Sequence, residues 1–302
     1  MGNDFIFKNE ICGWSSWGDL FQSIEVWEPL VNIILGKENL PVSKIENLKP
    51  GTNAVFRSGK FVIKIYAPGE SGIDGARDKV SELFALSFAG SLGVPVSKII
   101  ASGEIMDKYN FSYVILEYLE GLDFKEASSE FTEDDKYRFA GRMREITDTF
   151  NIPCKPFNGI DVIHDPDRSD CWASYSEHFR KERLDYIGSH EFGKKIFVHG
   201  DLCYDNLIID EKGTIRIIDF ADSVLAPQCY EHGHLASVLF NFDRAYLSGY
   251  FGNYPEPSIV DLCFNGLIIH DFGGDIVDEN IAKPEEIDCL DDLRKKIINL
   301  LK

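Results

Sequence analysis

No stretch of the sequence approaches the roughly 18–20 consecutive apolar residues that span a bilayer. The first ten residues, MGNDFIFKNE, also lack a basic head followed by an apolar run, as a secretory signal would have. Ile6 stands where a myristoylation signal on Gly2 requires Ser or Thr. We therefore expect a soluble, cytoplasmic protein with no membrane partner.

Paired cysteine motifs are absent as well. The seven cysteines are odd in number and scattered, and no two of them have C-x-x-C spacing, which argues against a zinc site and a redox motif. Thiols in the core of a protein from a reducing cytosol are the expected interpretation. His232 and His234 in EHGH have no matching Cys or His cluster, so we expect them to be packing or loop histidines rather than metal ligands.

Basic residues are few: 31 Lys and Arg against 50 Asp and Glu give a net charge of −19. Such a charge repels phosphates and argues against a nucleic-acid partner. Residues 1–118 carry net −3 and residues 119–302 carry net −16. The acidity of the second part favours a cationic small molecule, although general solubility charge would produce a similar pattern.

Hydrophobic periodicity divides the chain into a β-rich part, 1–118, and an α-rich part, 119–302, which meet near 117–122. In the first part we expect one amphipathic helix within 18–36, strands within 49–70, 98–105 and 109–119, and a second helix within 78–96. In the second part helices are expected within 131–150, 171–188, 234–251, 258–274 and 284–302. The expected fold class is α+β.

The segment FVHGDLCYDNLIIDEKGTIRIIDFAD, residues 197–222, interrupts those helices with two strands around a three-residue turn. If Asp210 pairs with Thr214, then Asn206 lies opposite Ile218, next to Asp219, with the strands about 5 Å apart. Asp201 enters the same end of the hairpin. Clustered carboxylates are costly unless a cation or a proton-transfer role compensates them.

Asn and Asp oxygens suit Mg²⁺, which commonly keeps waters and substrate phosphates as further ligands. A separate carboxylate, Asp201, can accept a hydroxyl proton or orient the hydroxyl for attack. This division of roles is the one found in phosphoryl transfer.

HGDLCYDN followed by IIDFAD resembles the aminoglycoside phosphotransferase and choline kinase group, which has a protein-kinase-like fold of two lobes. The group's H-G-D-x-x-x-x-N loop and later D-F match at five positions: His199, Gly200, Asp201, Asn206 and Asp219. The resemblance implies that Asp201 is the catalytic base, that Asn206 and Asp219 hold Mg²⁺, and that ATP or GTP is the donor.

Weaker matches lie in the first part. By resemblance, Lys64 in FVIKIY contacts the nucleotide phosphates and Glu82 pairs with it, whereas a lone strand lysine usually faces solvent. Residues 50–59 resemble the loop that covers the phosphates, with backbone N–H groups of Gly51, Thr52 and Asn53 facing them. Residues 117–119 (Glu117, Tyr118 and Leu119) match the segment whose backbone binds adenine.

Two departures separate the chain from protein kinases: Ala221 replaces the Gly of D-F-G, and the A-P-E ending of an activation segment is missing. The family often continues with G-D-P and Y-D, whereas this chain reads APQCYEHGH. Glu231 stands at the place of that Asp, where helix capping is favoured over a substrate contact. Asp222 and Glu231 are the candidate contacts to a cationic acceptor.

The leading hypothesis is an ATP- and Mg²⁺-dependent kinase that phosphorylates a hydroxyl of a small molecule, such as an aminoglycoside. Choline, amino sugars and sugars stay open as acceptors, and a role in antibiotic resistance would follow only by analogy. A nucleotide-binding pseudokinase is the alternative from another class. Its weakness is that a scaffold does not need Lys64, Asp201, Asn206 and Asp219 together.

Overall fold

A computed structural model of the chain describes residues 5–49, 51–165 and 170–302. Gly2, and Pro50 at the start of the 50–59 loop, lie outside the described residues. The chain separates into two compact units. Unit 1 comprises Met1–Ser91 and Pro95–Glu120, and unit 2 comprises Leu92–Val94 and Gly121–Lys302.

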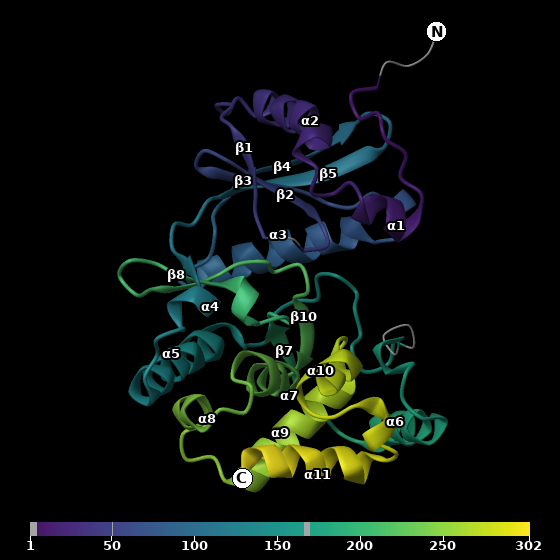
Figure 1. Cartoon of the computed structure of the whole chain (residues 1–302), viewed down its shortest axis with the longest axis vertical. Coiled ribbons are helices and arrows are strands. Elements are labelled where there is room, and N and C mark those ends of the chain that lie inside the picture. The colour runs from purple at the N-terminus through teal and green to yellow at the C-terminus, as the bar shows by residue number, and fades with distance from the viewer. Residues whose placement is uncertain (1–4, 50, 166–169) are drawn as a thin grey trace. The chain divides into compact units, whose positions relative to one another are not determined.

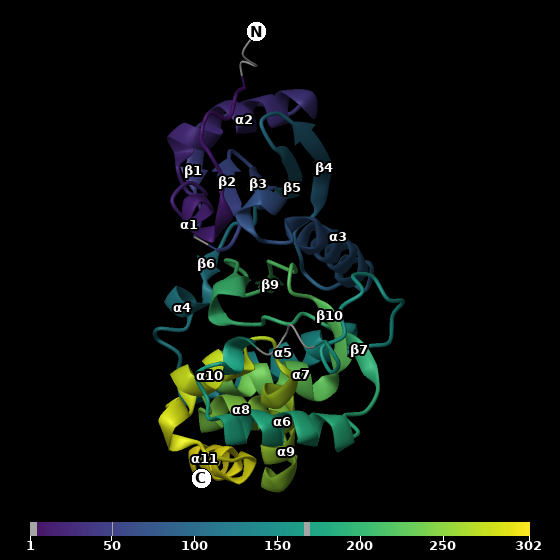
Figure 2. The same ribbon diagram turned by 90° about the vertical axis from the view of Figure 1, so that its right-hand side faces the viewer.

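Unit 1 is built on a five-stranded antiparallel sheet with the order β1-β2-β3-β5-β4. Its strands are β1 (Ile45–Asn47), β2 (Ala54–Ser58), β3 (Phe61–Ile65), β4 (Ile99–Met106) and β5 (Asn110–Glu117). The described residues of unit 1 also form the helices α1 (Gly13–Gly18), α2 (Ile24–Lys37) and α3 (Gly75–Ser91), with a 3₁₀ turn η1 (Gly69–Ser71). The helices α2 and α3 lie on different sides of this sheet (Figures 1 and 2).

The core of unit 1 is aromatic. The ring of Trp27, on α2, lies 4.9 Å from Phe7 and 5.3 Å from Phe111, on β5, between centroids. Trp17 of α1 contacts Trp27 edge-on at 5.5 Å. The helix predicted within 18–36 begins only at Ile24, because residues 19–23 connect two helices, α1 and α2, which bury Trp17 and Trp27 respectively.

Unit 2 is largely helical. Its α-helices are α4 (Phe124–Ala127), α5 (Glu133–Phe150), α6 (Glu177–Ser189), α7 (Gln228–His234), α8 (Arg244–Phe251), α9 (Glu256–Ile269), α10 (Gly273–Asn280) and α11 (Leu290–Leu301). A π-helical stretch, η4 (Leu235–Leu239), continues α7, and η3 (Tyr204–Asn206) and η5 (Pro284–Glu286) are 3₁₀ turns. Thr132 caps α5 through a capping box, as its sequence predicts. The α+β class is confirmed.

Two small sheets lie within unit 2. β7 (Lys195–Val198) pairs with β10 (Val224–Pro227), and β8 (Leu207–Ile209) lies between β6 (Leu122–Asp123) and β9 (Ile215–Ile217). The hairpin register is the predicted one, with Leu207 opposite Ile217 and a hydrogen bond from Asp210 N to Thr214 O at 3.1 Å. The pairing of β7 with β10 was not predicted.

Several helices of unit 2 are shorter than predicted. The 234–251 segment is broken between η4 and α8, where Asn241 and Phe242 have φ of 45° and 55°. This left-handed backbone cannot continue a right-handed helix. The 258–274 segment is divided between α9 and α10, the 284–302 helix begins only at Leu290, and the 171–188 helix begins at Glu177.

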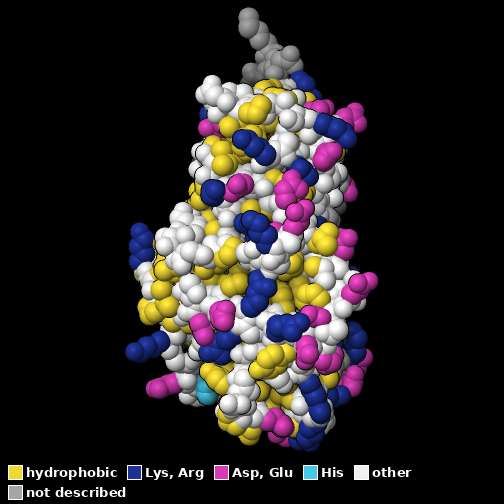
Figure 3. All heavy atoms as spheres, turned by 90° about the vertical axis from the view of Figure 1, so that its left-hand side faces the viewer, with side chains coloured by type: hydrophobic (Ala, Val, Ile, Leu, Met, Phe, Trp, Pro, Cys, Tyr) yellow, Lys and Arg dark blue, Asp and Glu magenta, His cyan; other side chains and the backbone are white. Residues whose placement is uncertain are grey.

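On the face drawn in Figure 3, acidic and basic side chains are interspersed, so the negative charge does not form a single-sign patch there. None of the helices in the described part of the chain has both the length and the apolarity needed to cross a bilayer. All seven cysteines are free thiols.

Candidate active site

The loop that follows β7 places Asp201 in unit 2. His199 is fully buried; its Nε2 lies 3.1 Å from the carbonyl oxygen of Ile218, and its Nδ1 accepts from the Asp201 N–H at 3.2 Å. These partners require a neutral imidazole with its proton on Nε2. Burial favours the same form by lowering the pKa of His199 to about 4. His199 therefore links the loop to Ile218, which lies between β9 and Asp219.

Both carboxylate oxygens of Asp201 have donors. Asn206 Nδ2 donates to Oδ2 at 2.9 Å and to the backbone oxygen of Asp201 at 2.8 Å. His234 Nε2 lies 3.3 Å from Oδ1. Burial acts to raise the pKa of Asp201, but the hydrogen bond from His234 and the fields of the nearby histidines outweigh it and lower the pKa to about 2. The carboxylate is thus ionised and fixed at neutral pH.

Glu231, on α7, accepts hydrogen bonds from the backbone of this loop. Its Oε1 accepts from the N–H of His199 at 3.3 Å and its Oε2 from the N–H of Gly200 at 3.1 Å. Burial raises its pKa to about 7, although those two hydrogen bonds oppose the rise. The predicted capping role is wrong, because the carboxylate binds loop amides 31 and 32 positions earlier in the chain rather than its own helix. With 1% exposure it is also not placed to contact an acceptor.

Gly200 is required by the geometry of the loop. Its φ is +89°, and a Cβ at this position would lie 2.2 Å from the backbone oxygen of Asp222. The loop and the segment after Asp219 therefore touch backbone to backbone. The side chain of Asp222 is exposed.

Backbone pairing places Asn206 and Asp219 at the same open end of the hairpin, in the register that the sequence predicts. The N–H of Ile218 donates to the backbone oxygen of Asn206 at 3.0 Å, which places Asp219 one residue beyond this pair. Asp219 has φ +57°, an uncommon conformation for a residue with a Cβ, and it turns the chain out of β9.

The donor set fits Mg²⁺. Both hydrogen bonds that the Asn206 amide makes with the described residues use Nδ2, and its Oδ1 accepts none from them. The amide oxygen of Asn206 and the carboxylate of Asp219, one residue beyond the Asn206–Ile218 backbone pair, are hard oxygen ligands, which suit an ion that takes waters and phosphates for the rest. Within residues 5–49, 51–165 and 170–302, no group of three or more His, Cys, Asp or Glu side chains is placed to hold a metal ion. His232 and His234 therefore belong to no such group.

Unit 1 holds the predicted ion pair. Lys64 Nζ, on β3, lies 2.8 Å from Glu82 Oε2, on α3, and their side chains are 6% and 1% exposed. Tyr66, two residues further along the chain from Lys64, donates its hydroxyl to the same oxygen at 2.6 Å. Gly75, at the start of α3, allows close packing against Ala67, because a Cβ there would lie 2.3 Å from the Ala67 oxygen. A solvent-facing Lys64 is thereby excluded.

The loop before β2 is anchored on two sides. Trp17 Nε1 donates to the Thr52 oxygen at 2.8 Å, and Asn53 Oδ1 accepts from the Ala67 N–H at 3.1 Å. Gly51 and Thr52 are exposed, whereas Asn53 is buried. Phosphate binding by the backbone of these three residues stays a prediction.

The segment after β5 uses two of its three amides internally. The N–H of Glu117 donates to Lys98 O and that of Tyr118 to Lys60 O, both at 2.9 Å. The guanidinium of Arg57 lies 3.7 Å from the centre of the Tyr118 ring. A separate cleft of unit 1, lined by Ala67, Pro68, Gly69, Glu70, Ala76, Glu104, Asn110 and Ser112, includes none of the predicted nucleotide-binding residues.

Sequence reasoning missed His234, Tyr66 and the role of Glu231. For Tyr66 a signal existed, because it alternates with Lys64 and faces the same side of the strand. The contacts of Glu231 and His234 join α7 to a loop about thirty residues earlier, and no local pattern reports such a contact.

Residues 159–261 match the sequence model of the phosphotransferase enzyme family, a range that contains Asp201, Asn206, Asp219, Glu231 and His234. A search of curated proteins finds no match.

Solved structures of similar fold include the GDP complex of aminoglycoside 2'-phosphotransferase-IIIa, with 17% identity over 89% of this chain and 98% of that one, at a TM-score of 0.59. The streptomycin–ATP complex of APH(2")-IIa has 15% identity, covers 87% and 97%, and gives 0.56. The choline kinase LicA from Streptococcus pneumoniae has 16% identity, covers 89% and 98%, and gives 0.55.

The resemblance found in the sequence is confirmed by these comparisons. The chain has the protein-kinase-like fold of aminoglycoside phosphotransferases and choline kinase, and its residues 159–261 carry the pattern of the phosphotransferase enzyme family.

Proposed function

We propose that the protein is an ATP- and Mg²⁺-dependent O-phosphotransferase that phosphorylates a hydroxyl of a small molecule. The family match and the fold support a small-molecule phosphotransferase. The observation that carries the proposal is the ionised Asp201, held through both oxygens beside the hairpin end with Asn206 and Asp219. A surface hairpin with capping acids would not need this arrangement.

Asp201 acts on the acceptor hydroxyl. A carboxylate whose pKa is about 2 is a weak base, so it first orients the hydroxyl by accepting a hydrogen bond. As the acceptor oxygen bonds to the γ-phosphorus, the bond from that phosphorus to the bridging oxygen breaks and releases ADP. The hydroxyl proton then passes to Asp201 and on to solvent. Late proton transfer suits the loose transition state of this reaction.

Residues of unit 1 would bind the nucleotide. Lys64, held by Glu82, would neutralise charge on the phosphates, and the N–H groups of Gly51, Thr52 and Asn53 would face phosphate oxygens. Since the N–H groups of Glu117 and Tyr118 are used internally, we expect Leu119 to supply the amide that binds adenine.

Asn206 Oδ1 and Asp219 would hold the magnesium ion. When bound, Mg²⁺ would neutralise the charge that develops on the phosphates. Asn206 would then bind the metal through Oδ1 while its Nδ2 donates to Asp201. One side chain would thus link the position of the metal to that of the Asp201 carboxylate.

The acceptor is best sought among cations. Residues 119–302 carry net −16, and Asp222 is exposed beside the loop of Asp201. The neighbours of similar fold include proteins crystallised with kanamycin and gentamicin, and a choline kinase. An aminoglycoside is therefore the first acceptor to test, with choline and sugars as alternatives. A role in antibiotic resistance would follow from aminoglycoside turnover.

The test is phosphoryl transfer from ATP or GTP, with Mg²⁺, to a panel of aminoglycosides, choline, amino sugars and sugars. We expect turnover of one acceptor class, its loss with a chelator, and a fall of about 10³-fold or more in Asp201→Asn and Asp219→Asn. Asp134→Asn, an exposed acid on α5, is the matched control and should keep full activity. Binding of nucleotide with no turnover on any acceptor would favour the pseudokinase.

A further inference from the structure

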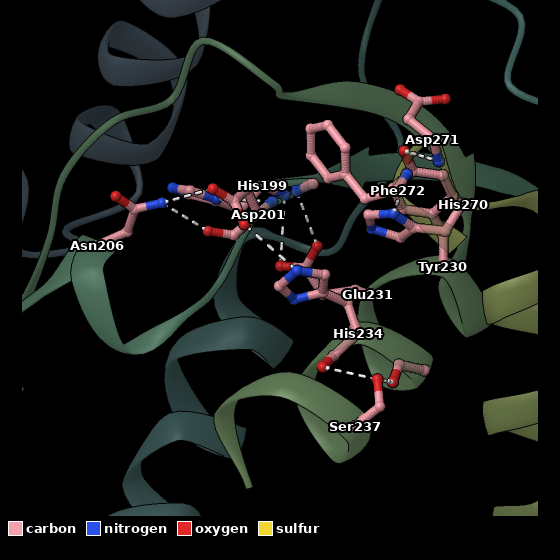
Figure 4. A network of polar contacts seen from close by, with 12 residues as sticks. His199, Asp201, Asn206, Tyr230, Glu231, His234, Ser237, His270, Asp271 and Phe272 are labelled. Carbon is pink, nitrogen blue, oxygen red and sulfur yellow. Dashed lines mark hydrogen bonds and ion pairs between the residues drawn. The ribbon is translucent and has the colours of Figure 1, made fainter. Parts of the chain in front are cut away.

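His234 occupies a position that the roles assigned above leave unexplained. Its Nε2 lies 3.3 Å from Asp201 Oδ1, while Asn206 approaches Oδ2 from the other side (Figure 4). The imidazole is 3% exposed. An ionised carboxylate only accepts hydrogen bonds, so the Nε2 of His234 carries the proton in this contact.

Among the described residues, the His234 ring makes its ion-pair contact with Asp201 through Nε2, whereas its buried Nδ1 has no hydrogen-bond partner there. A buried nitrogen without a partner is unfavourable, and an aliphatic side chain would avoid that cost. What distinguishes His234 from His232, whose two buried ring nitrogens both lack a hydrogen-bond partner among the described residues, is its contact with the Asp201 carboxylate.

The backbone of α7 is fixed at the residue before His234. A Cβ on Gly233 would lie 3.1 Å from the Cα of Gly266 on α9, so the two helices touch through glycines. The π-helical turn Leu235–Leu239 begins directly after His234. Such turns in helices occur frequently at functional sites, where they redirect side chains.

Stacked rings fix the plane of the imidazole. The ring of His270 stacks on that of His234, with 4.9 Å between centroids and an interplanar angle of 22°. The ring of Tyr230 in turn stacks on His270, with 4.1 Å between centroids and an angle of 24°. His270 is itself oriented, because its Nδ1 accepts from the Phe272 N–H at 3.1 Å. Figure 4 shows the His270 ring beside that of His234.

We propose that His234 is a positioning residue for phosphoryl transfer: its Nε2–H fixes the Asp201 carboxylate in the orientation that engages the acceptor hydroxyl. The proposal rests on the proposed function. With Asn206 on one oxygen and His234 on the other, rotation of the carboxylate is restrained, and its remaining lone pairs would accept the hydrogen bond of the acceptor hydroxyl. Correct orientation of a reacting group is worth large factors in rate.

Three variants test the proposal. His234→Leu removes the donor, and His234→Gln keeps an N–H at a similar reach. His232→Leu is the matched control, because His232 is equally buried on α7 but contacts Tyr250 and Phe251 edge-on. Kinetics with the acceptor found in the panel should show kcat lowered about 10- to 100-fold in His234→Leu, with KM for ATP unchanged.

His234→Gln should recover kcat to within about 5-fold of wild type, and His232→Leu should match wild type. Equal kcat in His234→Leu and His232→Leu would overturn the proposal. If His234→Leu does not fold, His234→Gln decides: kcat near the wild-type value supports positioning, and a loss of about tenfold or more contradicts it.

A second measurement does not depend on turnover. In protein with ¹⁵N-labelled histidine, the Nε2–H signal of His234 should shift or vanish in Asp201→Leu and stay unchanged in Glu211→Gln, an exposed residue of the hairpin turn. An unchanged signal in Asp201→Leu would overturn the contact. A wild-type protein that phosphorylates no acceptor would instead refute the proposed function, whatever this signal shows.

Discussion

Replacing Glu231 by Leu should lower both the stability of the protein and its turnover number, because it removes the acceptor that holds the Asp201 loop. The buried carboxylate accepts the N–H groups of His199 and Gly200 at 3.3 and 3.1 Å, and Leu would leave both amides without an acceptor. Each unsatisfied buried N–H costs about 1–3 kcal/mol. Part of this cost is offset, because Leu also removes a carboxyl group whose burial is unfavourable, as its pKa of about 7 shows. The expected loss of unfolding free energy is about 3 kcal/mol.

The effect on turnover should exceed the effect on stability. Asp201 follows Gly200 directly, so a shift of about 1 Å in the loop is expected to lower kcat about 10²-fold. Urea unfolding measures the first quantity and steady-state kinetics the second. Glu231→Gln, which keeps one acceptor oxygen, should fall between Glu231→Leu and wild type, and Glu256→Gln, at an exposed position on α9, should match wild type. Wild-type kcat in folded Glu231→Leu would refute the reasoning.

Three further changes follow from buried groups. Lys64→Met should cost about 3 kcal/mol of unfolding free energy because Glu82 is left buried without its cation, and adding Glu82→Leu should restore part of it in urea titrations. His232 should destabilise the protein in acid: burial lowers its folded pKa to about 3, so from about pH 6.5 downwards the unfolded state takes up the proton first. Between pH 7 and pH 4, the free energy of unfolding should fall by about 3 kcal/mol less in His232→Leu than in wild type. An equal fall in the two proteins would contradict the assignment. Gly200→Ala, whose Cβ would meet the Asp222 oxygen, should cost more than about 2 kcal/mol, and wild-type stability in thermal unfolding would refute the required close approach.

Local patterns predicted the hairpin well. Its turn chemistry and alternation are short-range features, so the pairing of Asn206 with Ile218 and the position of Asp219 followed from the sequence. The Lys64–Glu82 contact joins a strand to a helix, and local pattern alone did not require it. It was expected because two weak signals stood in the order that the resemblance implies.

The remaining features depend on contacts between distant segments. The break at Asn241 and Phe242 interrupts an apolar pattern that continues at helical spacing, and only the left-handed backbone reveals it. Glu231 and His234 reach a loop that precedes them by about thirty residues, so their roles come from how α7 packs on the site. The sequence identified the residues proposed to act on substrates better than the residues that hold them in place.

The central claim is that this site transfers phosphate to a carbon-bound hydroxyl. ³¹P NMR of a reaction with ATP, Mg²⁺ and the acceptor tests it most directly, because a phosphomonoester and inorganic phosphate give distinct signals. We predict a phosphomonoester signal that grows with that of ADP in wild type and is missing in Asp201→Asn. Growth of ADP with inorganic phosphate alone, at the same rate in both proteins, would contradict the account.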